Sequence, residues 1–427
     1  MKILVIGSGA REHALLWKLS QNSKHPELFC APGNAGTAQL AKNIPVKTTA
    51  LPDLLSFAKI EKIDLTVVGP EQPLMDGIVD LFEENGLNIF GPRKAAAEIE
   101  GSKVFAKHFM QKYKIPSASF RSFDLTEQNN AIDYINALSP PIVIKADGLA
   151  AGKGVSICET RGEAVQTIDA MMGKKIFGDA GTRIVIEEFL EGFETSVLVL
   201  TDGGNFVTLV PSQDHKRILD GDKGKNTGGM GVYAPVPMVS FEMLEEIKRH
   251  IIKPTLEGMA KEGRTYKGCL YAGLMITQQG PKVIEFNCRF GDPETEVVLP
   301  LLDDDLVDLM MDISAGTLSK TEARLKQLSA VSVIIASGGY PDAYETGKKI
   351  LGLDTIAAID DIIVFHAGTK TENGAVLTSG GRVLAVTALG PKDNFEETIR
   401  KAYSAVKKIT FDGAYYRSDI GKKGLLR

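Results

Sequence analysis

The chain has 427 residues, 44% of them hydrophobic, and its 49 basic residues stand against 54 acidic ones. This length is typical of about three domains, and the near balance of charge gives no bias toward nucleic acid or an anionic membrane. Apolar runs stay far below the roughly 20 residues of a membrane span, the first residues lack a signal-peptide pattern, and the four scattered cysteines form no Cys-x-x-Cys motif, so we expect a soluble, cytoplasmic protein.

The N-terminal region alternates short apolar runs with helical patterns. Runs at 3–6, 28–30, 65–68 and 88–90 each end at glycine or proline. Strands that alternate with helices indicate a parallel sheet, and ligands of such sheets bind beyond the carboxyl ends of the strands. We therefore expect the glycine and proline turns of this region to face a ligand.

The rest of the chain predicts a small lobe, a second sheet and a third unit. A helix is expected over 103–113, and the apolar runs between about 123 and 190 predict a separate lobe. After residue 328 the strand pattern starts again. The other expected elements are a glycine-rich loop at 221–231, a helix at 242–262, a hairpin of 270–276 with 281–287, and a helix at 395–408.

Two glycine-rich motifs are similar to nucleotide-binding loops without matching them. Gly7-Ser8-Gly9-Ala10-Arg11-Glu12 follows the first strand, but Glu12 stands where a dinucleotide fingerprint needs glycine. This turn could still bind an anion through backbone N–H groups, or be a plain tight turn. Residues 147–154 are one residue short of a P-loop and lie between two strands, which predicts a phosphate-covering flap, with a flexible surface hairpin as the alternative.

Polar side chains alternate along the strand predicted at 281–287. Glu285 and Asn287 are two positions apart and Arg289 follows them, so an extended chain would direct all three to one face. A carboxylate and an amide oxygen suit Mg²⁺ or Mn²⁺, and the arginine could bind a second anion. We interpret the turn Asp292-Pro293-Glu294 as support for Arg289. A strand face that simply meets solvent would show the same alternation.

Two weaker signals lie between these motifs. The segment Glu187 to Glu194 follows a strand and could bind an adenine edge and a ribose, or be an acidic surface loop. His215 could act as a general base, or be a hydrogen-bonded loop histidine.

Together these motifs resemble the ATP-grasp superfamily and, within it, the family of phosphoribosylamine–glycine ligases (glycinamide ribonucleotide synthetases). The resemblance spans essentially the whole chain, and the run Arg289-Phe290-Gly291-Asp292-Pro293-Glu294 is its most specific part. The residues that carry it are 9–15, 32–36, 68–71, 101–103, 145–154, 226–231, 289–294 and 416–421.

The resemblance implies an α/β fold of three domains. These are an N-terminal parallel-sheet (pre-ATP-grasp) substrate-binding domain at 1–102, a two-lobed ATP-grasp domain at 103–327 with a mobile lid lobe at about 123–190, and a small C-terminal α+β domain at 328–427.

The same resemblance implies an ADP-forming ligase of purine biosynthesis. It would join glycine to 5-phosphoribosylamine through glycyl phosphate, with ATP as co-substrate and Mg²⁺ or Mn²⁺ as cofactor. It further implies a monomer that binds neither nucleic acid nor membranes. Two alternatives stay open: another ATP-grasp carboxylate–amine ligase or carboxylase, and a non-catalytic nucleotide-binding module or NAD-dependent regulator.

Matched position by position, the resemblance assigns roles to site residues. Glu285 and Asn287 would hold the metal, and Arg289, Asp214 and Lys145 are expected in catalysis. The residues expected to bind ATP are Lys103, Lys145, Gly148, Gly152, Lys153, Gly154, Glu187, Phe189, Leu190 and Glu194. Those expected to bind glycine and phosphoribosylamine are Gly9, Arg11, Glu12, Gly33, Asn34, Gly36, Glu71, Asp214, Arg289 and Gly291.

Overall fold

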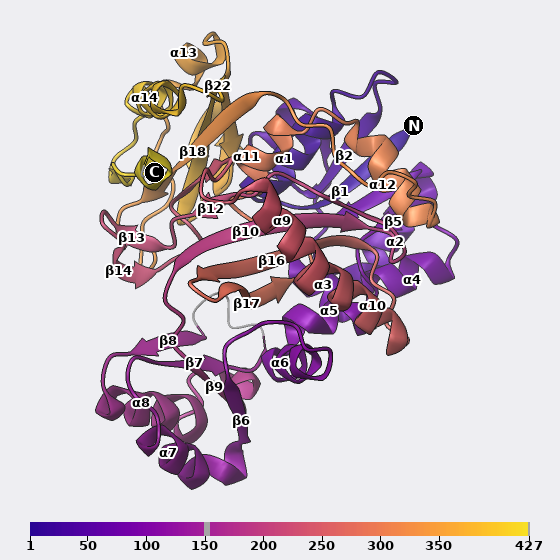
Figure 1. The fold of residues 1–427 in the computed structure, drawn as a ribbon. Helices are drawn as coiled ribbons and strands as arrows, with labels where there is room; N and C mark the ends of the chain where they lie inside the picture. The colour runs from indigo at the N-terminus through magenta and orange to yellow at the C-terminus, as the bar shows by residue number, and fades with distance from the viewer. Residues whose placement is uncertain (149–153, 426–427) are drawn as a thin grey trace.

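The computed structural model describes residues 1–148 and 154–425. They form a layered body from which one lobe projects, at the bottom of Figure 1. Among the helices in these residues, none is long and apolar enough to cross a membrane.

The N-terminal part is a parallel sheet, as the alternating pattern predicted, and its five strands have the order β3-β2-β1-β4-β5. The central strand β1 is buried over nearly its whole length because helices cover both faces of such a sheet. The turns predicted to face a ligand follow the carboxyl ends of the strands. The elements are β1 (Lys2–Gly7), α1 (Ala10–Leu19), β2 (Glu27–Pro32), β3 (Lys42–Asn43), α2 (Leu51–Glu61), β4 (Leu65–Val68), α3 (Glu71–Asp76), α4 (Ile78–Glu84), β5 (Ile89–Phe90) and α5 (Lys94–Gly101).

The projecting lobe is an antiparallel sheet in the order β6-β9-β7-β8, backed by two helices. It has a core of its own, in which Phe123, Ile144 and Ile186 from the sheet pack with Ile135 and Ile168 from the helices. The lobe therefore does not depend on the body for its apolar packing. Its elements are β6 (Phe120–Asp124), α7 (Gln128–Asn136), β7 (Ile142–Ala146), β8 (Val155–Cys158), α8 (Arg161–Ile168) and β9 (Arg183–Glu188).

The central sheet has the order β11-β10-β16-β17 and includes the predicted hairpin. Helix α6 begins at Ser102, whose hydroxyl accepts a hydrogen bond from Phe105 N at 3.0 Å. The helix expected at 242–262 is instead divided by a π-turn at Lys248–Ile252. The elements are α6 (Lys103–Lys112), β10 (Phe193–Thr201), β11 (Phe206–Thr208), α9 (Phe241–Ile247), α10 (Lys253–Lys261), β16 (Gly268–Thr277), β17 (Gly280–Asn287), α11 (Thr295–Leu301) and α12 (Leu306–Ala315).

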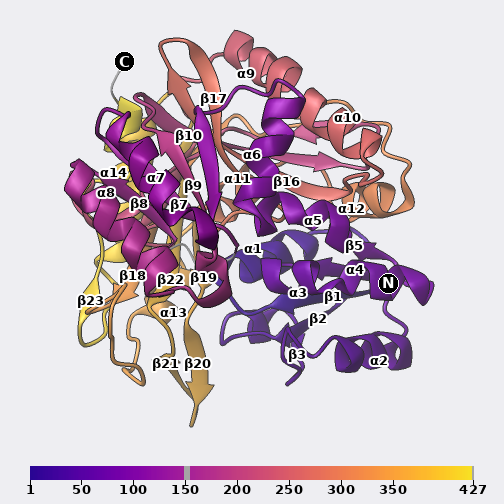
Figure 2. The same cartoon turned by 90° about the horizontal axis from the view of Figure 1, so that it is seen from below.

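The C-terminal sheet takes two of its strands from the middle of the chain. Its order is β12-β15-β18-β22-β19, with β23 paired to β18, and it lies beside the N-terminal sheet (Figure 2). The prediction of a glycine-rich loop at 221–231 is wrong in part, because β14 lies in this range and forms a hairpin with β13. The elements are β12 (Gln213–Asp214), β13 (Arg217–Leu219), β14 (Lys223–Asn226), β15 (Gly231–Ala234), β18 (Leu328–Ser337), α13 (Leu353–Ala357), β19 (Ile362–His366), β20 (Thr369–Glu372), β21 (Ala375–Thr378), β22 (Arg382–Pro391), α14 (Phe395–Val406) and β23 (Ala414–Tyr415).

One apolar core joins the N-terminal and central sheets. Leu4 and Phe82 from the first sheet region belong to the same buried cluster as Met259 and Leu274 from the second. This shared packing fixes the turns that follow β1, β2 and β4 relative to the end of β17.

Candidate active site

The metal-binding pair predicted from the sequence lies at the end of β17. Glu285 pairs across the sheet with Gly273, and Asn287 pairs with Tyr271. The Glu285 side chain is 37% exposed, with Lys216 Nζ 4.0 Å from its Oε1. Burial alone would raise the pKa of Glu285, but the charges of Lys216, Lys145 and Lys103 bring it below its ordinary value. This carboxylate is therefore ionised and open to a ligand at neutral pH.

Arg289 lies beyond the end of β17, so it is not a third residue of the strand face as predicted. Its guanidinium nevertheless lies near the predicted metal-binding pair, with one nitrogen 3.4 Å from Asn287 Oδ1. Two carboxylates hold it, Glu71 at 3.4 Å and Glu100 at 3.3 Å. Although burial opposes ionisation, the charges of Glu100 and Glu71 raise the pKa of Arg289.

The carboxylates of the Asp292-Pro293-Glu294 turn, which was predicted to support Arg289, are paired with other groups. Asp292 Oδ1 is paired with Arg382 at 2.9 Å. Glu294 is buried and accepts hydrogen bonds from Ser196 (3.2 Å) and Tyr271 (3.1 Å). The turn therefore links β10, β16 and β22. Gly291 is required for this packing, because a Cβ there would lie 2.3 Å from Glu294 Oε2.

Lys216 connects the two halves of the site. Its Nζ lies 3.1 Å from Glu194 Oε2 and 4.0 Å from Glu285 Oε1, and the charge of Glu194 is the main cause that raises its pKa well above the ordinary value. Two residues earlier, Asp214 sits where burial and the charge of Glu294 raise its pKa. The sequence did not single out Lys216, although it stands beside Asp214 in the same polar run.

The candidate general base His215 is buried. Its Nδ1 lies 3.2 Å from the carbonyl oxygen of Gly231, and burial lowers its pKa to about 4. It is therefore uncharged at neutral pH and a weak base, and its contact with a backbone carbonyl fits the alternative of a hydrogen-bonded loop histidine.

Three lysines lie where ATP phosphates were predicted to bind. Lys103 Nζ donates to the carbonyl of Gly148 at 2.9 Å, and Lys145 Nζ donates to the carbonyl of Ile284 at 3.0 Å. Lys145 and Lys107 each lie 3.1 Å from the same oxygen of the buried Glu187. Within the described part of the chain, the other oxygen of Glu187 has no hydrogen-bond partner. The sequence analysis missed Lys107, although it follows Lys103 by one helical turn.

Of the remaining residues predicted to bind ATP, some lie near the lobe and others lie outside the described residues. Phe189 and Leu190 lie in the segment between β9 and β10, with Phe189 exposed, and Glu194 lies on β10. Gly148 and Gly154 flank the predicted flap. Gly152 and Lys153 lie outside the described residues.

A polar cavity of about 330 Å³ lies at the carboxyl ends of β1 and β2. It includes the predicted residues Gly9, Gly33 and Asn34, and the Asn34 amide nitrogen donates to the carbonyls of Ser8 (2.9 Å) and His366 (2.8 Å). The sequence did not show that the C-terminal part completes this cavity. The residues contributed from beyond the N-terminal part are Asp292, Ala367, Gly368, Thr369, Ser379 and Arg382.

Glu12 explains why the first glycine turn lacks its third glycine. One carboxylate oxygen accepts a hydrogen bond from Gly9 N at 2.5 Å and the other is paired with Arg11 at 2.6 Å. A Cβ at Gly7 or Gly69 would lie under 3 Å from this side chain, so both glycines make room for it. The buried glutamate therefore holds the turn from inside.

Two buried histidines link α1 to β19 beside this cavity. His366 N donates to His13 Nδ1 at 2.8 Å, and His366 Nδ1 lies 3.1 Å from Thr369 Oγ1. Gly36 is packed against His13, because a Cβ there would be 2.4 Å from its ring. Burial lowers the pKa of His366 from 6.5 to about 4, and burial with the charge of His366 lowers that of His13 to about 3.

These lowered pKa values predict loss of stability in mild acid. Because the unfolded chain binds protons at His366 more readily than the folded chain, its contribution is complete above pH 6.5 and is lost as pH falls toward about 4. We expect this group to lower the free energy of unfolding by about 3 kcal/mol over that range. Urea unfolding at several pH values should show a shallower pH slope for His366→Gln than for the wild type. Equal slopes would contradict the assignment.

The donor set at β17 fits a hard divalent cation. Among residues 1–148 and 154–425, no group of three or more His, Cys, Asp or Glu side chains forms a metal cage. Mg²⁺ does not need one, because it commonly takes one or two carboxylates and completes its shell with water and substrate phosphates. Glu285 and Asn287 Oδ1 supply two protein oxygens within reach of the lysines.

Comparisons with known proteins agree over the whole chain. The family descriptions that match are phosphoribosylglycinamide synthetase N domain (residues 1–100), ATP-grasp (A) domain (101–295) and C domain (330–423). A phosphoribosylamine–glycine ligase of Neisseria meningitidis is 51% identical over 429 aligned positions that cover 100% of each chain. The crystal structure of phosphoribosylamine–glycine ligase from Thermotoga maritima is 37% identical, with a TM-score of 0.83, over 98% of this chain and 100% of that chain.

A more distant structure is similar in fold alone. The biotin carboxylase domain of 2-oxoglutarate carboxylase from Hydrogenobacter thermophilus has a TM-score of 0.73 at 18% identity, covering 97% of this chain and 91% of that chain.

Proposed function

Because the chain belongs to the phosphoribosylglycinamide synthetase family, we propose that it joins glycine to 5-phosphoribosylamine, converting ATP to ADP and phosphate and forming glycinamide ribonucleotide for purine biosynthesis. One observation carries the proposal. The carboxylate–amide end of β17 lies among the charges of Lys103, Lys145 and Lys216, and Arg289, which contacts Asn287, is paired with Glu71 after β4 of the N-terminal sheet.

This arrangement suits activation of a carboxylate by phosphorylation. The glycine carboxylate is a poor electrophile, and transfer of the γ-phosphoryl group gives it a phosphate leaving group as glycyl phosphate. Such transfer requires positioning and neutralisation of charge rather than a covalent nucleophile, and the lysines supply positive charge. The amine of phosphoribosylamine then attacks the acyl carbon, the bond to phosphate breaks, and the amine loses a proton.

We assign the substrates to three parts of the site. ATP would lie between the lobe and the central sheet, against Lys103, Lys145, residues 187–190, Glu194 and the 148–154 flap. Glycine would lie between Arg289 and Asp214, where its ammonium group would offset the burial that raises the pKa of Asp214. Phosphoribosylamine would occupy the cavity at Gly9, Gly33 and Asn34, near Arg11, Glu12, Gly36, Glu71 and Gly291.

We propose that Glu285 and Asn287 hold Mg²⁺, with Mn²⁺ able to take its place. When bound, the ion neutralises charge on the ATP phosphates. The lysines keep Glu285 ionised and so prepare it for a cation.

An ADP-release assay with purified protein tests the function. ATP, Mg²⁺, glycine and phosphoribosylamine made in situ are combined, and each is omitted in turn. We expect ADP only in the complete mixture, and no ADP there would refute the proposal. ADP driven by bicarbonate or formate in place of glycine would assign the chain to another ATP-grasp reaction.

We also propose a cytoplasmic monomer with domains at 1–102, 103–327 and 328–427. The lobe at about 123–190 would move as a lid, because its core is its own. Sedimentation velocity should give the mass of one chain at micromolar concentration, and a stable dimer would correct this.

A further inference from the structure

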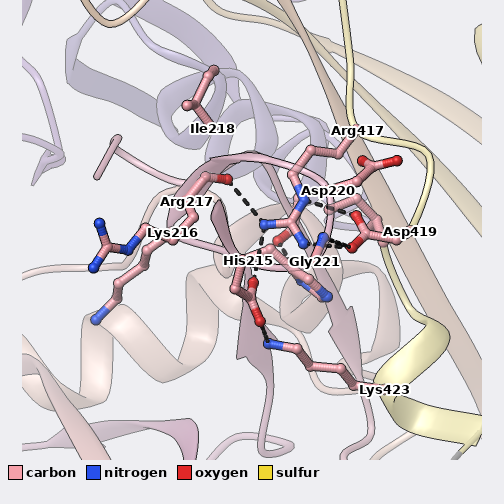
Figure 3. Close-up of polar contacts among 12 residues, drawn as sticks. His215, Lys216, Arg217, Ile218, Asp220, Gly221, Arg417, Asp419 and Lys423 are labelled. Carbon is pink, nitrogen blue, oxygen red and sulfur yellow. Dashed lines mark hydrogen bonds and ion pairs between the residues drawn. The ribbon is translucent and has the colours of Figure 1, made fainter. Parts of the chain in front are cut away.

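The C-terminal segment 415–423 binds the β13–β14 hairpin. Its central residue is Arg417, whose side chain is 0% exposed. The guanidinium donates two hydrogen bonds to the carboxylate of Asp419, both at 2.8 Å, in a bidentate pair. Its remaining nitrogen donates to the hairpin, to the carbonyl of Arg217 (2.9 Å) and to Asp222 Oδ1 (3.1 Å). Figure 3 shows Arg417 between Asp419 and the hairpin residues.

Further contacts join the same two segments. The Tyr415 hydroxyl donates to the carbonyl of Ile218 at 2.9 Å, and Ser418 N donates to Asp220 Oδ1 at 2.8 Å. Lys423 is also paired with Asp222, and in the opposite direction Gly221 N of the hairpin donates to Asp419 Oδ2 at 2.8 Å. The hairpin is therefore held through its backbone and through two acidic side chains.

The hairpin has little apolar packing to hold it otherwise. The β13 residues are exposed or half-buried, and so are those of β14. A two-stranded hairpin without a hydrophobic face is marginally stable at best in water. Its order must come from the polar contacts, and Arg417 makes the most buried of them.

The base of the hairpin carries the site residue Lys216. Thr227 closes the base, because its N and its Oγ1 both donate to the carbonyl of Lys216 at 2.8 Å. Lys216 precedes Arg217, whose carbonyl Arg417 binds, and its own Nζ reaches Glu194 and Glu285. One unbroken set of contacts thus runs from the C-terminal segment to the predicted metal carboxylate.

We propose that Arg417 is a positioning residue for the ligase reaction. By fixing the β13–β14 hairpin, it places Lys216 between the carboxylates expected to serve ATP and the metal. This inference rests on the proposed function. It also accounts for the run at 416–421, which no step of the reaction uses.

Kinetics of Arg417→Met test the proposal. We expect kcat/KM for glycine and the apparent affinity for Mg²⁺ each to fall by about 10–100-fold. Losses of this size are typical of residues that orient metal ligands without touching the metal. The KM for phosphoribosylamine should stay within about twofold, because its cavity lies on other elements. Amide exchange should rise at 217–226 and stay low in β18 and β22. Arg417→Lys keeps the charge without the fork, and it should restore part of the loss.

Two further variants complete the test. Asp222→Asn weakens the same contact from the partly exposed hairpin side, so it serves if Arg417→Met does not fold. Lys401→Met removes another ion pair of the C-terminal part, with Asp361 at 2.7 Å, and should leave the kinetics unchanged.

The outcomes separate this inference from the proposed function. An active wild type with a lowered melting temperature but unchanged kinetic constants in Arg417→Met and Asp222→Asn would overturn the positioning role alone. A wild type without glycine-dependent ADP release would overturn the function as well.

Discussion

The Glu285→Gln variant is expected to lose at least about 100-fold in kcat/KM for glycine-dependent ADP release, which corresponds to roughly 3 kcal/mol of transition-state stabilisation. The amide keeps the shape of the side chain but loses the charge that the surrounding lysines favour. Folding should be unaffected, because the side chain is partly exposed and Lys216 keeps its closer partner Glu194.

Rates measured over a range of Mg²⁺ concentrations make this prediction specific. The apparent dissociation constant for Mg²⁺ should rise in Glu285→Gln, while the melting temperature stays unchanged. Glu245→Gln is the matched control, because Glu245 pairs only with Lys248 at the surface of α9 among the ion pairs of the described chain. Turnover like that of the wild type in Glu285→Gln would remove the metal assignment.

The Arg289→Met variant should lose both activity and stability. Glu100 would remain buried with its charge uncompensated, and removing one partner of a buried ion pair costs about 3–5 kcal/mol. In the double variant Arg289→Met/Glu100→Gln the buried group is neutral, so we expect it to recover a large part of the stability and none of the activity.

Urea unfolding of the single and double variants separates these effects. Arg93→Met provides the control, because its pair with Glu83 is exposed and such pairs contribute about 0–1 kcal/mol. Equal stability of the single and double Arg289 variants would show that Glu100 is not the group left uncompensated.

Helices and strands could be predicted from the sequence where the local pattern of apolar residues alone determines them. Apolar runs that end at Gly7, Pro32 and Gly69 predicted the parallel strands and the turns at their carboxyl ends, and two adjacent runs predicted the β16–β17 hairpin. The joining of β12 and β15 to the C-terminal sheet could not be predicted in this way. β12 has only two residues and pairs with β15, and the partner of β15 in turn is β18, which is chosen by packing across a long sequence separation.

The site residues were predicted one at a time, but not their partners. Spacing placed Glu285 and Asn287 on one strand, and the family resemblance supplied the substrates. The carboxylates that hold Arg289 and Lys145 come from α5 and β9, and periodicity carries no information on such contacts. For the same reason the partner of Asp292 was not predicted, since Arg382 is distant in sequence but adjacent in the fold.

The composite C-terminal sheet also has a consequence for how the chain is made. β15, which follows helix α6 and the projecting lobe in the sequence, hydrogen-bonds along its length to β18, which begins at Leu328. During synthesis, β15 cannot pair with β18 until almost a hundred further residues have emerged from the ribosome. A chain terminated before β18 would therefore leave one edge of β15 unpaired and open to aggregation.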